Sequence, residues 1–206
     1  MKIGKLIYCI AFFTMLTING FSQPQNKTSD VTAWQKQINE EYSNKVTSPL
    51  SMTARAKFTG FEFFKEDAKL KVIATLVINS VKKEVGLKTS SAFILKQTEY
   101  GQINFSIEGK KYSLTIYQSP THLQEKGLED YLFLPFTDES NGEETYGGGR
   151  YIDLKIPEKG NVIFVDFNKA YNPYCAYSTG FSCPKVPENN NLPIKILGGV
   201  KYVSSH

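Results

Sequence analysis

The chain has 206 residues and a formal net charge of +4, with 24 basic and 20 acidic residues. This length is enough for one domain with its own hydrophobic core and is short for two. The lysines are scattered along the chain rather than gathered into a stripe, which argues against a nucleic-acid-binding protein.

The first 22 residues have the pattern of a secretory signal peptide. Lys2 and Lys5 precede an apolar run over residues 6–18, and the small residues Gly20 and Ser22 fit a cleavage site. The apolar run is short for a membrane span, and its removal leaves 22 basic residues against 20 acidic ones. We therefore expect an extracytoplasmic protein, periplasmic or secreted, with no membrane span after signal cleavage.

A polar linker over residues 23–30 leads into one predicted amphipathic helix. The apolar positions recur at steps of three and four, and they are Val31, Trp34, Ile38 and Tyr42. Ser29 or Asp30 can cap this helix, because both side chains accept hydrogen bonds from free N–H groups of a first turn. Residues 31–206 are expected to form a single domain, on which the apolar stripe packs unless it binds a partner.

Residues 58–78 predict a first pair of β-strands. Apolar and polar residues alternate over 58–63 and again over 70–78, with a turn at 65–68. This period is typical of strands that bury one face, so the chain is expected to change from helix to sheet here.

The clearest hairpin is predicted over residues 102–117, with a two-residue turn at Gly109-Lys110. This turn places Ile107 opposite Tyr112 and, further along, Phe105 opposite Leu114. The apolar side chains of both strands then share one face. The other face should meet water, and it carries Asn104, Ser106, Ser113 and Thr115.

Several short strands are predicted after this hairpin, over residues 131–136, 150–156, 162–167, 192–197 and 200–203. Residues 162–167 are almost continuously apolar, which favours a central strand covered on both faces. The stretch 168–191 is too rich in prolines and turn formers for regular structure. Many short strands behind one N-terminal amphipathic helix predict a mainly β fold, either an antiparallel sandwich or a partly open barrel.

An acid-rich block lies between Gly127 and Leu154, where Arg150 is the single base. Asp166 ends an apolar strand, so its carboxylate needs a partner if it is buried. Arginine offers a planar fork for a bidentate carboxylate contact, and the chain has only Arg55 and Arg150. We therefore expect Arg150 and Asp166 to lie within side-chain reach, either as a structural clamp or as part of a ligand site.

Two segments resemble the DUF1684 family, a domain family of unknown function. Residues 144–151 read Glu-Thr-Tyr-Gly-Gly-Gly-Arg-Tyr, and residues 166–177 read Asp-Phe-Asn-Lys-Ala-Tyr-Asn-Pro-Tyr-Cys-Ala-Tyr, followed by Cys183-Pro184. The resemblance covers nearly all of the chain after the signal peptide. It implies no activity, cofactor or catalytic residue, so the function must be argued from the residues themselves.

Tyrosines beside acidic, amide and arginine side chains are typical of a platform for a sugar or another small molecule. The predicted ligand-binding residues are Tyr146, Arg150, Asp166, Asn168, Tyr171 and Asn172. The alternative for the tyrosines of this region is packing against a disulfide loop. The leading hypothesis is a non-catalytic domain that binds a small molecule or glycan between residues 138–151 and 166–177.

Three alternatives remain open. A hydrolase would use Asp166 with Glu143 or Glu144 as a carboxylate pair. A calcium ion would need an oxygen cage, for which the candidates are Asp138, Asn141, Glu143 and Glu144. A purely structural domain would have no open site. No cofactor is predicted, because residues 147–149 lack the glycine spacing of a dinucleotide site.

The cysteines that remain after signal cleavage are Cys175 and Cys183, and they can form a disulfide in an oxidising compartment. Two free thiols and a zinc site are the alternatives. Zinc would need further ligands, and the histidines of the chain are His122 and His206. Nucleophilic catalysis would need His122 as its base, and this residue lies in a polar loop.

Overall fold

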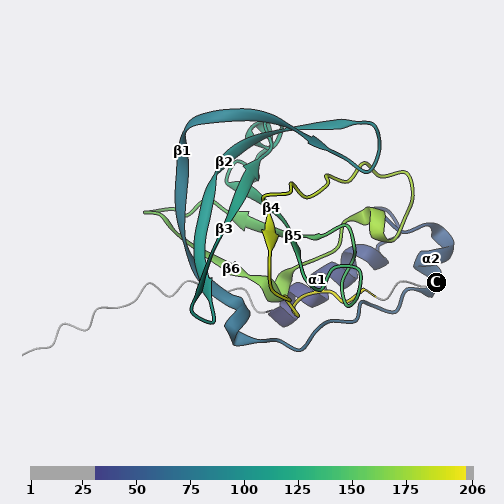
Figure 1. Cartoon of the computed structure of the whole chain (residues 1–206). Coiled ribbons are helices and arrows are strands. Elements are labelled where there is room, and N and C mark those ends of the chain that lie inside the picture. Colours follow the sequence, from purple (N-terminus) through teal and green to yellow (C-terminus); the bar gives the residue numbers. More distant parts are fainter. Residues whose placement is uncertain (1–30, 203–206) are drawn as a thin grey trace, which may run out of the picture.

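Residues 31–202 are described by a computed structural model, and most of them belong to or pack against one β-sheet (Figure 1). The strands are β1 (Lys71–Lys88), β2 (Ile94–Ile107), β3 (Lys110–Gln118), β4 (Tyr131–Asp138), β5 (Arg150–Lys155), β6 (Val162–Asp166) and β7 (Asn191–Leu192). The helices are α1 (Val31–Ser43), α2 (Met52–Lys57) and the 3-10 turns η1 (Ala68–Leu70), η2 (His122–Gln124), η3 (Phe167–Lys169) and η4 (Tyr174–Ala176). The predicted signal peptide and linker lie outside the described residues.

The main strands are antiparallel neighbours in the order β5-β4-β3-β2-β1-β6, and the sheet curls into a nearly closed barrel. The short strand β7 pairs with β4 in parallel. This arrangement confirms the predicted mainly β fold with one N-terminal amphipathic helix. The additional helix α2 was not expected; Ser51 begins it by accepting a hydrogen bond from the backbone N–H of Ala54.

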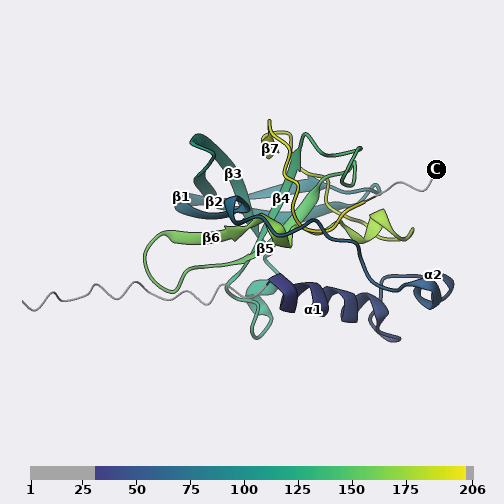
Figure 2. The same ribbon diagram turned by 90° about the horizontal axis from the view of Figure 1, so that it is seen from below.

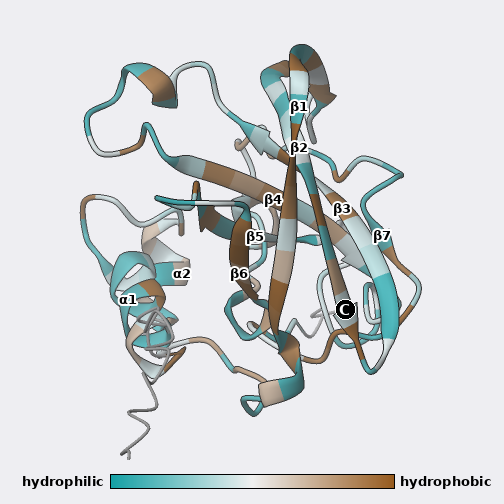
Figure 3. Cartoon of the chain, turned by 90° about the vertical axis from the view of Figure 1, so that its left-hand side faces the viewer, coloured by the Kyte–Doolittle hydropathy of each residue, from teal (hydrophilic) through white to brown (hydrophobic). Residues whose placement is uncertain are grey.

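The main core lies inside the curled sheet, where the inward residues of successive strands meet. In β1, Val72, Ala74 and Leu76 are buried and their neighbours are exposed, as expected for a strand with one face on the core. Figure 3 shows hydrophobic stretches along the strands and a largely hydrophilic α1. No helix within residues 31–202 is long and apolar enough to cross a membrane.

The hairpin of β2 and β3 has the predicted apolar face but a different register. Its turn is at Glu108-Gly109, both with positive φ, and it pairs Phe105 with Tyr112 and Ile103 with Leu114. Positive φ at both turn residues is the pattern of a type I′ turn, whose twist matches the flanking strands. The shift in pairing is two residues, so every side chain keeps its predicted face.

Thr115 departs from the prediction that its face meets water, because the chain near Asn190 covers it. The buried Asn190 side chain accepts a hydrogen bond from the N–H of Thr115 and donates to the carbonyls of Thr115 and Pro135, at 2.7–2.9 Å. One amide thus links the backbones of β3 and β4, which share a single paired position at Tyr117 and Phe133.

The predicted strand at residues 58–63 is wrong. Phe58, Phe61 and Phe63 instead pack around Tyr42 of α1 and Val200, as a cluster of aromatic residues outside the sheet. The helix forms a separate layer beside the sheet (Figure 2). Its buried residues are Val31, Ile38 and Tyr42, which confirms the predicted apolar stripe.

Two predictions about the later strands are also wrong. Among the described residues, strand β6 pairs with β1 alone, and it exposes Val162 and Phe164, so it is an edge strand rather than a central one. Residues 192–197 and 200–203 were expected to form closing strands, but within the described residues they contribute only Leu192 to β7 and a single bridge between Val200 and Phe63. Hydrogen bonds to the buried side chains of Arg150 and Asp138, rather than a strand ladder, hold this segment against the sheet.

The predicted disulfide is present: Cys175 and Cys183 are bonded, with a Cα–Cα distance of 6.2 Å. The loop that it closes packs against the connection between β1 and β2. The Ser90 N–H donates to the carbonyl of Cys183, and Lys185 N–H donates to that of Lys88, each at 2.8 Å.

Loss of this disulfide should lower the free energy of unfolding by about 2.5 kcal/mol, because a closed loop of about nine residues restricts the unfolded chain. Denaturant unfolding with and without a reducing agent measures the effect. The same comparison on the Cys175→Ser/Cys183→Ser variant is the control and should show no difference. An unchanged midpoint for the parent protein would contradict the prediction.

Candidate functional site

Strand β5 directs its side chains alternately to the core and to the layer of α1. Arg150, Ile152 and Leu154 point into the core, whereas Asp153 lies on the opposite face and is exposed. Tyr171 lies beside this strand, because its backbone N–H and C=O exchange hydrogen bonds with those of Tyr151 at 3.0 and 2.9 Å. An acidic and an aromatic side chain are thus placed together under the helix.

A pocket of about 290 Å³ lies between α1 and this part of the sheet. Helix α1 contributes Trp34 and Glu41 from one flank of its apolar stripe, and the sheet side contributes Asp153 and Tyr171. We call it the aromatic pocket, and it is lined by Trp34, Gln37, Ile38, Glu41, Tyr42, Asp153, Lys169, Tyr171 and Tyr174. Four of these side chains are aromatic, two are acidic and one is basic.

The carboxylate of Asp153 is held in place by two tyrosines. The hydroxyls of Tyr131 and Tyr171 both donate to Asp153 Oδ1, at 2.7 and 2.6 Å. Burial, reinforced by the nearby Asp153 charge, raises the pKa of both tyrosines well above the usual value. These hydroxyls therefore stay protonated at neutral pH and remain donors to the carboxylate.

Glu41 is held in a similar way on the helix side. The hydroxyl of Tyr174 donates to Glu41 Oε1 at 2.6 Å, and burial together with this hydrogen bond raises the pKa of Tyr174. The Tyr174 ring meets Tyr42 edge to face, with centroids 5.8 Å apart. Each carboxylate of the pocket thus has one oxygen that is fixed by a tyrosine hydroxyl.

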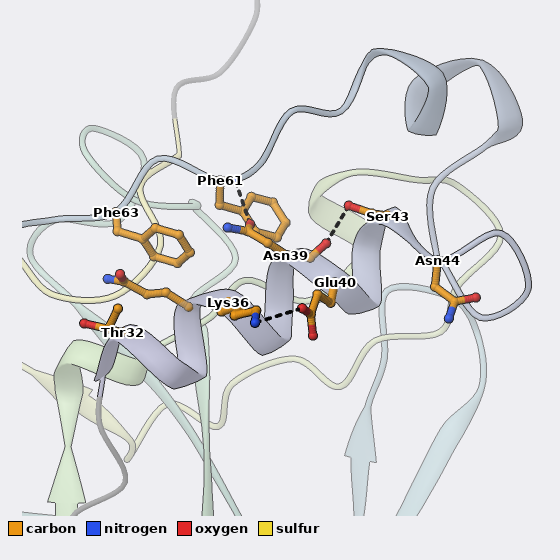
Figure 4. Close-up of a pocket in the computed structure, with 9 residues that line it drawn as sticks. Thr32, Lys36, Asn39, Glu40, Ser43, Asn44, Phe61 and Phe63 are labelled. Carbon is orange, nitrogen blue, oxygen red and sulfur yellow. Dashed lines mark hydrogen bonds and ion pairs between the residues drawn. The ribbon is translucent and has the colours of Figure 1, made fainter.

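A second hollow, which we call the open groove, lies on the other flank of α1 and has a volume of about 670 Å³ (Figure 4). Its polar side chains largely contact the protein itself. Asn39 Oδ1 accepts the N–H of Phe61, the Ser43 hydroxyl donates to the Asn39 carbonyl, and Lys36 pairs with Glu40. The open groove differs from the aromatic pocket, which brings four aromatic side chains together with two tyrosine-anchored carboxylates.

Arg150 does not pair with Asp166, contrary to the expectation from the sequence. Its guanidinium is completely buried and donates to Asp138 Oδ2 at 2.7 Å and to the carbonyls of Ile196 and Gly198 at 2.7 and 2.6 Å. Asp138 Oδ1 accepts hydrogen bonds from the backbone N–H groups of Ser140 and Ile196. The result is a structural clamp between β4, β5 and the C-terminal segment.

Burial lowers the pKa of Arg150, although the Asp138 charge opposes this shift. Removal of either partner of this buried ion pair is costly, because the other charge is left uncompensated in the core.

The other predicted ligand residues do not converge on one site. Tyr146 meets Tyr202 edge to face, with centroids 5.1 Å apart. Asp166 Oδ1 accepts from the N–H and side chain of Asn168, and the buried Asn168 also bonds the backbone of Asp67. The remaining two predicted residues are Tyr171, which lines the aromatic pocket, and the buried Asn172, which donates to the Tyr177 hydroxyl.

The carboxylates of the hydrolase and calcium hypotheses have separate protein partners. Glu143 and Glu144 both accept from Lys195, at 2.7 and 2.8 Å, which lowers the pKa of Glu143. Asn141 Oδ1 accepts from the N–H of Asp138, whose carboxylate binds Arg150. Within residues 31–202 no group of three or more acidic, cysteine and histidine side chains could hold a metal ion.

Sequence reasoning missed most of the aromatic pocket. Tyr171 was included, but Trp34 and Tyr42 were assigned to a packing stripe, and Asp153 was only counted within the acid-rich block. The helix and β5 are more than 100 residues apart in the sequence. The one available signal was the step of three between Tyr171 and Tyr174 beside a strand with an outward acidic residue.

Comparison with known proteins supports this description of the fold. The chain is similar to an uncharacterized protein of Haloarcula marismortui, solved by solution NMR, with a TM-score of 0.67 and 30% sequence identity over 85% of this chain and 94% of that chain. No curated protein matches. Residues 56–201 match the family described as "Protein of unknown function (DUF1684)". The chain therefore belongs to the DUF1684 family.

Proposed function

We propose that this protein is a non-catalytic domain that binds a small molecule or a single sugar unit in the aromatic pocket. The observation that carries the proposal is the meeting of four aromatic side chains with two tyrosine-anchored carboxylates in one pocket. Aromatic faces bury the apolar parts of a ligand, and a few oriented polar groups select it. A volume of about 290 Å³ suits a ligand at the small end of the usual range.

Binding accounts for the geometry better than hydrolysis does. A hydrolase needs two carboxylates that face the same substrate from different environments. Asp166 is held by Asn168, whereas Glu143 and Glu144 are held by Lys195. In the aromatic pocket the tyrosine hydroxyls orient the carboxylates as fixed acceptors, which favours recognition.

We also propose that the domain acts outside the cytoplasm, in the periplasm or after secretion. The predicted signal peptide supports this location. The Cys175–Cys183 disulfide supports it as well, because such bonds persist in oxidising compartments.

Tyr174→Ala should weaken the binding of any pocket ligand at least tenfold, because it removes one aromatic wall and releases Glu41. Trp34 is the single tryptophan of the chain and lines the pocket, so its fluorescence reports occupancy directly. A library of small polar molecules is screened by this signal, and hits are checked by thermal shift.

Tyr146→Ala is the matched control, because Tyr146 packs on Tyr202 and is not part of the pocket. Binding should be unchanged in this variant. The proposal fails if no compound at millimolar concentration changes the emission of Trp34. It also fails if hits survive Tyr174→Ala but are lost with Tyr146→Ala.

A further inference from the structure

We infer that the ligand of the aromatic pocket is a small organic cation with an ammonium group. This inference rests on the proposed function and names the class of molecule that the pocket binds. It depends on three features of the pocket: its net charge, the carboxylate oxygens that can accept a hydrogen bond from a ligand, and the aromatic walls.

The charged residues of the pocket are Glu41, Asp153 and Lys169, which sum to one negative charge. Lys169 already takes part in an interaction within the protein. A neutral ligand would cover both carboxylates and leave the excess charge desolvated, which is costly. A ligand with a positive charge offsets the negative charge of these carboxylates.

The oxygens that remain for a ligand are acceptors. Asp153 Oδ1 receives both tyrosine hydroxyls and Glu41 Oε1 receives one. Both Asp153 and Glu41 are exposed residues that line the pocket, so part of each carboxylate is accessible to a ligand. The hydroxyl protons of Tyr171 and Tyr174 are already donated to these carboxylates. A ligand that brings donors or positive charge therefore complements this part of the pocket.

The aromatic walls add a second attraction for a cation. Trp34, Tyr171 and Tyr174 line the pocket with part of their surface accessible, and the buried Tyr42 packs against Tyr174 behind them. The negative face of an aromatic ring attracts an ammonium group, and tryptophan does so most strongly. A neutral ligand of the same shape makes the same apolar contacts but lacks this electrostatic attraction to the rings.

Choline and its neutral carbon isostere, 3,3-dimethylbutan-1-ol, form a matched pair of probes with nearly the same shape. Titration of the full chain should give a saturable change of Trp34 fluorescence with choline and at least tenfold weaker binding of the isostere. Methyl glucoside is the third probe and represents a neutral sugar. Equal binding of choline and its isostere would overturn the inference.

Asp153→Asn and Glu41→Gln should each weaken choline at least tenfold and leave the isostere unchanged, because each variant keeps an oxygen for its tyrosine and loses the charge. Asp130→Asn is the control, since Asp130 pairs with Lys155 on the surface near the same strand. Thermal unfolding shows that each variant is folded. Glu41 lies on an exposed helix face, so Glu41→Gln still tests the need for a negative charge if Asp153→Asn is unstable.

The outcomes separate the inference from the proposed function. If methyl glucoside binds in the pocket and choline does not, the inference is wrong and the proposed function stands. If choline binds equally well to the parent and to both charge variants, the charge argument is wrong although a pocket ligand exists. If neither these probes nor the wider library change Trp34 fluorescence, both fail.

Discussion

Arg150→Ala should lower the free energy of unfolding by about 3–5 kcal/mol, the range for breaking a buried ion pair. The variant leaves Asp138 charged in the core and removes the donor to two buried carbonyls, those of Ile196 and Gly198. Chemical denaturation monitored by circular dichroism measures the loss. A variant that retains the parent stability within about 1 kcal/mol would show that the clamp is not structural.

The chain provides its own control for this prediction. Arg55 is the other arginine, and within residues 31–202 its guanidinium donates to the carbonyl of Lys45 near the surface. Arg55→Ala should change stability by less than about 0.5 kcal/mol. In addition, Arg150→Ala combined with Asp138→Ala should cost less than the sum of the two single changes, because neither charge is then left alone. Strict additivity would contradict a direct pair.

Gly199→Ala should destabilise the protein by about 3 kcal/mol or more, through strain and steric overlap together. Gly199 has φ of +78°, and a Cβ atom there would lie 2.1 Å from the carbonyl oxygen of Ala170. The N–H of Val200 donates to this same oxygen at 2.9 Å. The backbones at Gly199 and Ala170 therefore cannot move apart without breaking this hydrogen bond. Urea denaturation measures the change.

Gly160→Ala separates the effect of backbone strain from that of steric overlap. Gly160 has a similar φ of +71°, but a Cβ atom there would meet nothing within 4 Å. This variant should lose only about 1–2 kcal/mol, the cost of a left-handed conformation for alanine. Equal losses in the two variants would show that the contact with Ala170 is not tight.

Local patterns predicted the helix and the presence of strands because these depend on nearby residues. The stripe from Val31 to Tyr42 needs only a period of 3.6 and a starting cap. The β2–β3 hairpin shows the limit of this information. A turn at Glu108-Gly109 and a turn at Gly109-Lys110 bury the same side chains, so alternation alone cannot decide between the two registers.

The clamp and the pocket depend on distant residues, which explains why sequence reasoning placed them less well. Asp138 ends β4 and Arg150 begins β5, and Phe136 faces Arg150 in the ladder between these strands. Pairing the two strands in the sequence would have indicated that Asp138 and Arg150 share a face. No comparable local rule links Trp34 of α1 to Asp153 of β5, since only the folded chain brings them together.

The contacts of Asn190 and residues 196–200 have a consequence for synthesis on the ribosome. These residues are translated after every strand from β1 to β6, yet they supply the acceptors of Arg150 and the amide that links β3 to β4. A nascent chain that lacks them therefore carries a core charge without its full set of partners. We expect the domain to acquire its native structure only after residue 200 has been added, rather than progressively from the N-terminal end during elongation.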